Sequence, residues 1–118
     1  VHLFESAIDL LSYATLLKMK GRDWRQDALL SLAGVFKRKR QGVVPLALSQ
    51  YLQDHPGINT FYLHLDNDEV GRGAAVGIME GLGDKYTVLD RPPPYGKDVN
   101  DLLQRQLGLM QRKEEWSR

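Results

Sequence analysis

Residues 58–68, which read Ile-Asn-Thr-Phe-Tyr-Leu-His-Leu-Asp-Asn-Asp, decide the fold. Residues 58–65 form a continuous run of aromatic and branched side chains, and such a run is typical of a central parallel strand buried on both faces. The run ends at Asp66, and a helical pattern follows at residues 69–81. A buried strand that leads directly into a helix is the building unit of an α/β fold.

The same alternation continues on both sides of this stretch. Further strands are predicted at residues 1–4, 28–33 and 86–89, and further helices at residues 7–19, 45–54 and 98–113. The stiff segment Arg91-Pro-Pro-Pro-Tyr-Gly96 lies outside any central strand. We therefore predict an α/β fold with one domain over residues 1–118, in which helices flank a four-stranded, mainly parallel sheet.

The apolar residues of two helices predict which faces they bury. In the first helix Ile8, Leu11, Ala14 and Leu17 have helical spacing, and Leu10 and Leu16 widen this stripe. The inward residues expected in the last helix are Leu102, Leu103, Leu107 and Met110. Both stripes are expected to face the core.

The composition fits a single folded domain. The chain has 118 residues, of which 42% are hydrophobic and 26% charged, a balance that argues against disorder. It contains no cysteine, and no apolar stretch approaches the roughly 20 residues needed to cross a bilayer. We expect no membrane partner and a cytoplasmic location. Because the chain opens directly on a strand without methionine, we expect it to be a piece of a longer protein, with other domains as partners.

Acidic residues follow three of the predicted strands. They are Glu5, then Asp66 and Asp68, then Asp98 and Asp101. The carboxyl ends of parallel strands share one edge of the sheet, so these side chains are expected to converge. A cluster of carboxylates needs a cation to offset its repulsion, and Mg²⁺, for which Mn²⁺ can substitute, prefers such oxygen ligands and works on phosphates. Each acidic residue alone could instead be a turn residue or a helix cap.

Basic residues are concentrated in one part of the chain. Residues 18–40 hold eight of the sixteen lysines and arginines, against only Asp23 and Asp27. The run Lys37, Arg38, Lys39 and Arg40 is a candidate contact for a nucleic-acid backbone, and Lys97 is a candidate contact for a phosphate. The alternative for the run is an ordinary solvated loop, and the alternative for Lys97 is an exposed lysine.

Three segments together resemble the motifs of the Toprim domain. They are residues 4–9 (Phe-Glu-Ser-Ala-Ile-Asp), residues 63–75 (Leu-His-Leu-Asp-Asn-Asp-Glu-Val-Gly-Arg-Gly-Ala-Ala) and residues 96–101 (Gly-Lys-Asp-Val-Asn-Asp). The resemblance covers essentially the whole chain. It implies a catalytic domain of the kind found in bacterial primases, type IA and type II topoisomerases and certain nucleases, acting on DNA or RNA and on nucleotides.

The resemblance also implies roles for individual residues. Glu5 would act as a general acid or base and touch metal, Asp66 and Asp68 would coordinate Mg²⁺, and Asp98 would lie near the metals. Asn100 stands where primases have a further acidic residue, and Asp101 is a possible substitute for it.

Residues 69–75 and the Gly-Lys-Asp segment are most similar to primase-like Toprim proteins of bacterial plasmids and mobile elements, which implies DNA-templated primer synthesis. A topoisomerase, a nuclease and a noncatalytic nucleic-acid-binding module are the alternatives.

Overall fold

The computed structural model describes residues 1–33 and 44–116, the last four by their backbone only. The strands are β1 (His2–Phe4), β2 (Leu29–Ser31), β3 (Thr60–Leu63) and β4 (Thr87–Asp90). The helices are α1 (Ala7–Met19), α2 (Leu46–Asp54), α3 (Glu69–Leu82), the short 3-10 helix η1 (Gly83–Lys85) and α4 (Val99–Trp116). The predicted order of strands and helices is confirmed. The basic run Lys37, Arg38, Lys39 and Arg40 lies outside the described residues.

The four strands form one sheet in the order β2-β1-β3-β4, and every neighbouring pair is parallel. Leu3 of β1 lies opposite Leu30 of β2 and Leu63 of β3, so β1 and β3 occupy the centre. The predicted α/β fold with a parallel sheet is thereby confirmed. Because all four strands point the same way, the loops that follow them leave from one edge.

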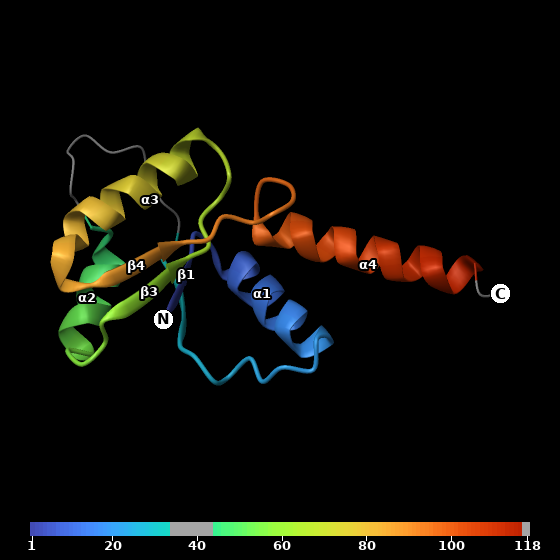
Figure 1. Cartoon of the computed structure of the whole chain (residues 1–118), viewed down its shortest axis with the longest axis horizontal. Coiled ribbons are helices and arrows are strands. Elements are labelled where there is room, and N and C mark those ends of the chain that lie inside the picture. Colours follow the sequence, from blue (N-terminus) through green and yellow to red (C-terminus); the bar gives the residue numbers. More distant parts are fainter. Residues whose placement is uncertain (34–43, 117–118) are drawn as a thin grey trace.

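Helices cover both faces of the sheet, with α2 and α3 on one side and α1 and α4 on the other (Figure 1). Alternate residues of β1 serve the two layers, as expected for a strand. Leu3 is fully buried in the core beneath α2 and α3, together with Leu48 and Ile78. Phe4 is fully buried in a smaller core with Leu16 of α1 and Val99 of α4.

The predicted inward face of α1 is wrong for two residues. Ile8 and Leu11 are 58% and 63% exposed, whereas Asp9 and Ser12 are buried. The reason is the contact between α1 and α4: the Ser12 hydroxyl donates to Asn100 Oδ1 at 3.2 Å, and the Asn100 amide donates to Asp9 Oδ1 at 3.2 Å. These polar contacts fix the rotation of α1 and leave Ile8 and Leu11 outside, while Leu16 is buried.

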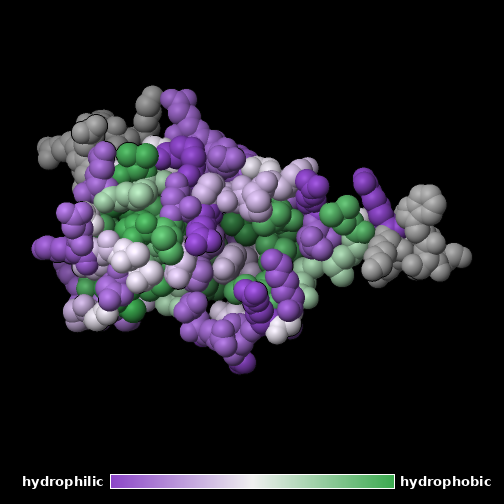
Figure 2. All heavy atoms as spheres, viewed as in Figure 1, coloured by the Kyte–Doolittle hydropathy of each residue, from purple (hydrophilic) through white to green (hydrophobic). Residues whose placement is uncertain are grey.

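The outer half of α4 also departs from the prediction. Leu102 and Leu103 pack beside the smaller core, but Leu107 and Met110 are 48% and 47% exposed. The helix extends beyond the body of the domain (Figure 1), and Figure 2 shows hydrophobic surface along that extension. An apolar stripe indicates that a segment is helical, but it does not show that another element of the chain packs against that stripe. Within residues 1–33 and 44–116, no helix is long and apolar enough to cross a membrane.

Candidate metal centre

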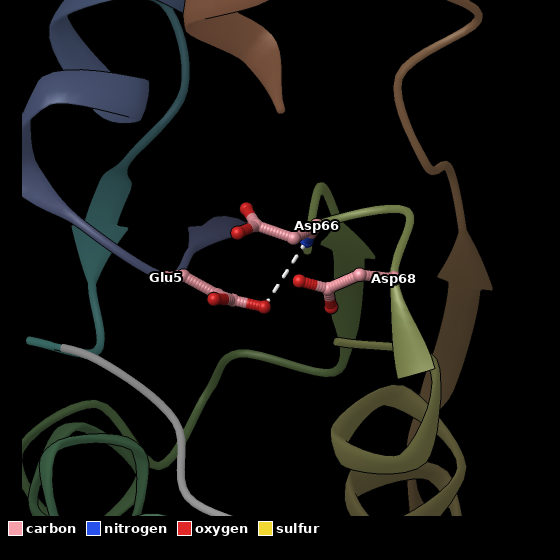
Figure 3. A group of neighbouring side chains, drawn as sticks. All are labelled: Glu5, Asp66 and Asp68. Carbon is pink, nitrogen blue, oxygen red and sulfur yellow. Dashed lines mark hydrogen bonds between the residues drawn. The ribbon is translucent and has the colours of Figure 1, made fainter. Parts of the chain in front are cut away.

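Three predicted carboxylates meet at the carboxyl edge of the sheet. Glu5 follows β1, and Asp66 and Asp68 follow β3, so neighbouring central strands bring them together. Each offers an oxygen that lies within 4.8 Å of the other two. Figure 3 shows the three side chains approaching one another, with the Asp66 amide donating to Glu5 Oε1 at 3.2 Å. The sheet thus assembles the convergence that the sequence predicts.

A second group of carboxylates shares Asp66. It consists of Asp9, Asp66 and Asp98, whose oxygens again lie within 4.8 Å of one another. Asp9 was not predicted as a site residue, because its spacing from Ser6 indicates a helix cap. The Asp9 amide indeed donates to Ser6 Oγ at 3.4 Å, and the Ser6 hydroxyl donates to Asp9 Oδ2 at 2.9 Å. Its position four residues after Glu5, in the first turn of a helix that begins at the same sheet edge, was the available signal.

Asp68 and Asp98 also cap helices, and this role is compatible with metal binding. Asp68 Oδ1 accepts from the Gly71 amide at 2.7 Å at the start of α3, and Asp98 Oδ1 accepts from the Asp101 amide at 2.8 Å at the start of α4. In each residue the cap fixes the carboxylate while using one oxygen. The cap and the metal ligand are therefore not exclusive alternatives.

Asp101 and Asn100 lie beside these groups and serve other contacts. Asp101 Oδ2 accepts from the Lys97 amide at 2.8 Å, which closes the loop before α4. Asn100 Oδ1 accepts from Ser12, so its amide side chain belongs to the contact between α1 and α4. Among the residues that the structure describes, neither is a member of the two carboxylate groups.

Burial, with a contribution from neighbouring negative charges, raises the pKa of three carboxyl groups in the centre. Burial, followed by the charges of Glu5 and Asp9, raises the pKa of Asp66 to about 7. Burial is also the main cause that raises the pKa of Glu5 and that of Asp9. Lys97 Nζ lies 3.7 Å from Asp68 Oδ2 and 4.0 Å from Asp66 Oδ2, and these two carboxylates raise the pKa of Lys97. A single exposed lysine thus balances part of the cluster.

The donor set fits a hard divalent cation. Asp66 is only 7% exposed, and its buried Oδ1 has no hydrogen-bond partner in the described part of the chain. A buried acceptor without a partner is costly, and a cation would remove that cost. The surrounding ligands are all carboxylate oxygens, which Mg²⁺ and Mn²⁺ prefer over nitrogen or sulfur. Both groups of residues can therefore hold such an ion.

Two residues at the start of α3 support the centre, and neither was predicted to do so. A Cβ on Gly71 would overlap the Asp66 carbonyl oxygen and lie 2.8 Å from Glu5 Oε1, so only glycine fits there. Arg72 donates to the carbonyl oxygens of Leu65 and Asp66 at 3.3 and 3.4 Å and pairs with Asp90 at 2.6 Å. It ties the loop after β3 to the end of β4.

Comparison with known proteins gives a match over the same region. A family model described as Toprim-like matches residues 2–103, which include both carboxylate groups, Gly71, Arg72 and Lys97. Searches of curated proteins and of solved structures found no significant match.

Proposed function

Because the chain belongs to the Toprim-like family, we propose that it performs metal-dependent phosphoryl transfer on nucleic acid, as primase-like nucleotidyl transfer. Toprim domains are magnesium-binding domains of enzymes that act on nucleic acids. The observation that carries the proposal is the pair of carboxylate groups that share Asp66, whose buried Oδ1 has no partner among the described residues.

The carboxylates of the two groups would hold two Mg²⁺ ions. Glu5, Asp66 and Asp68 would hold one Mg²⁺, and Asp9 and Asp98 would hold a second together with Asp66. When bound, Mg²⁺ offsets phosphate charge and the charge that develops in the transition state. The helix caps hold Asp68 and Asp98 in place before any ligand arrives.

Glu5 and Lys97 have the properties needed for proton transfer and phosphate binding. The raised pKa of Glu5 brings its proton exchange closer to neutral pH, which suits a general acid or base. The hydrogen bond from the Asp66 amide orients the Glu5 carboxylate. Lys97 is exposed and already lies beside two site carboxylates, so a phosphate bound there would meet its ammonium group.

The primase-like reading is supported by the small-residue helix at residues 69–75 and by the Gly-Lys-Asp segment at 96–98. Topoisomerases and nucleases share the Toprim domain, and a noncatalytic binding module would share the fold. These alternatives differ in their products: primer extension, altered DNA topology, strand cleavage or no turnover.

The test is a Mn²⁺ titration followed by relaxation or calorimetry. We expect the wild-type chain to bind Mn²⁺, Asp66→Asn to lose the binding, and Asp84→Asn, on exposed η1, to retain it. Templated nucleotide addition by the protein would then support the primase-like assignment. Absence of Mn²⁺ binding by the wild type, with or without nucleotide, would contradict the proposal.

A further inference from the structure

A cavity of about 360 Å³ lies away from the carboxylate groups and shares no residue with them. Its floor is the face of β1 and β3 that carries His2 and Tyr62. Tyr13 of α1, Arg22 and Trp24 of the connection after α1, and Arg91 after β4 line its sides. Its volume lies in the range of small-molecule binding sites.

Two arginine side chains of the cavity lining are available to bind a ligand. Asp23 Oδ1 accepts from Arg25 Nε at 3.1 Å, so a cation offsets its charge. Asp27 Oδ2 lies 3.4 Å from His2 Nε2, but burial lowers the pKa of His2, so the imidazole is neutral near pH 7 and Asp27 keeps its negative charge. Arg22 and Arg91 are exposed, and within the described residues their side chains form no hydrogen bond or ion pair. With Arg25, which pairs with Asp23, three guanidinium groups lie against the two carboxylates of Asp23 and Asp27, and this excess of one positive charge favours an anionic ligand.

Several aromatic side chains of the cavity stack on one another, whereas the ring of Trp24 is exposed. His2 stacks on Tyr62 with ring centroids 4.6 Å apart, and His2 Nδ1 and His64 Nε2 share a hydrogen bond of 2.7 Å. Trp24 is 44% exposed and has no ring contact among the described residues. An exposed indole beside free guanidinium groups suits a planar aromatic ligand that carries a negative charge.

We propose that this cavity binds one nucleotide unit, with its base stacked on Trp24 and its phosphate held by Arg22 and Arg91. The anionic and planar character follows from the cavity alone, whereas naming a nucleotide rests on the proposed function. The unit comes either from a free nucleotide or from an unpaired position in a single strand. In both cases binding needs no divalent cation, because the lining residues are separate from the carboxylate groups.

The experiment follows the fluorescence of Trp24. The chain has two tryptophans, so Trp116→Phe leaves Trp24 as the single reporter. In EDTA, a nucleoside monophosphate should give saturable quenching. Affinity should fall at least tenfold in Arg91→Gln and in Arg22→Gln and stay unchanged in Arg112→Gln, which makes the same charge change on α4. Circular dichroism checks that each variant is folded, and using two arginine variants keeps the test valid if one is not.

Two further titrations identify the ligand. A thymidine tetranucleotide that binds at least tenfold more tightly than the monophosphate assigns the cavity to a single strand, and equal affinities assign it to a free nucleotide. The proposal is overturned by absence of quenching, by unchanged affinity in both folded arginine variants, or by inorganic phosphate binding as tightly as the nucleotide. Mn²⁺ binding without nucleotide binding in EDTA would remove this inference and leave the metal centre intact.

Discussion

Replacement of Asp66 by asparagine should stabilise the metal-free protein, and the gain should depend on pH. In the unfolded chain Asp66 ionises near its ordinary pKa of 3.8, whereas in the fold burial and then the charge of Glu5 raise its pKa to about 7. The stability associated with this shift is complete below pH 3.8 and is lost as pH rises through 7. About three pKa units at about 1.4 kcal/mol each give an upper value of ~4 kcal/mol at pH 8.

The pKa shift of His64 makes the free energy of unfolding depend on pH in the opposite direction, so its contribution must be separated from that of Asp66. Burial, followed by the charge of His2, lowers the pKa of His64 from 6.5 to about 4, so its contribution is present above pH 6.5 and lost as pH falls through 4. The two slopes partly cancel in the wild type. The difference between Asp66→Asn and wild type at each pH removes the histidine contribution, and it should grow from near zero at pH 4 to its full value at pH 8.

Urea unfolding in EDTA, monitored by circular dichroism from pH 4 to pH 8, measures this difference. The exposed Asp84→Asn variant serves as the control and should show no such trend. Saturating Mn²⁺ at pH 8 should stabilise the wild type and leave Asp66→Asn unchanged, because a ligand stabilises only the folded state that binds it. A difference that does not vary with pH, or a wild type more stable than Asp66→Asn at pH 8 in EDTA, would refute this account of Asp66.

Three other variants test the support of the centre. Gly71→Ala should abolish Mn²⁺ binding and lower the free energy of unfolding in urea by about 1–3 kcal/mol, because its Cβ overlaps the Asp66 carbonyl. The control is Gly73→Ala, whose Cβ meets no atom within 4 Å and which should be neutral or stabilising. Equal behaviour of the two variants would contradict this prediction. Arg72→Gln should cost about 1–2 kcal/mol and weaken Mn²⁺ binding in calorimetry, and unchanged Mn²⁺ affinity would remove its positioning role. Lys97→Gln should keep or improve Mn²⁺ affinity while weakening nucleotide binding in the presence of Mn²⁺; loss of Mn²⁺ binding would show that Lys97 has another role.

The sequence predicted the order of strands and helices and the convergence of Glu5, Asp66 and Asp68. Both predictions depend on where each apolar strand run ends, and this is a local pattern. A buried strand run ending at Asp66 specifies the sheet edge, and parallel strands then bring Glu5 to the same place. The position of Asp9 beside Asp66 depends on how α1 is rotated, and that rotation is set by a contact with Asn100, 91 residues away in sequence. No local pattern reports such a contact.

Long-range contacts also explain why the sequence did not predict the exposed face of α1 or the contacts of Arg72. Ile8 and Leu11 have helical spacing, but burial of Asp9 and Ser12 turns them outward. Arg72 reaches Asp90 on the next strand, a pairing that needs the strand order to be known. The cavity beside His2 likewise collects residues from five separate segments.

The long α4 is tied to the carboxylate groups at its start and lies outside the body of the domain at its far end (Figure 1). Asn100, in its first turn, contacts both Asp9 and Ser12, and Leu102 and Leu103 pack beside the smaller core, whereas the outer part of the helix projects from the body (Figure 1). Eighteen residues span about 27 Å at about 1.5 Å each, so a tilt of about 10° at Asn100 swings the far end by about 5 Å. Because the Asn100 amide that donates to Asp9 Oδ1 belongs to this helix, one contact sets both the orientation of α4 and the position of Asp9 in the second carboxylate group.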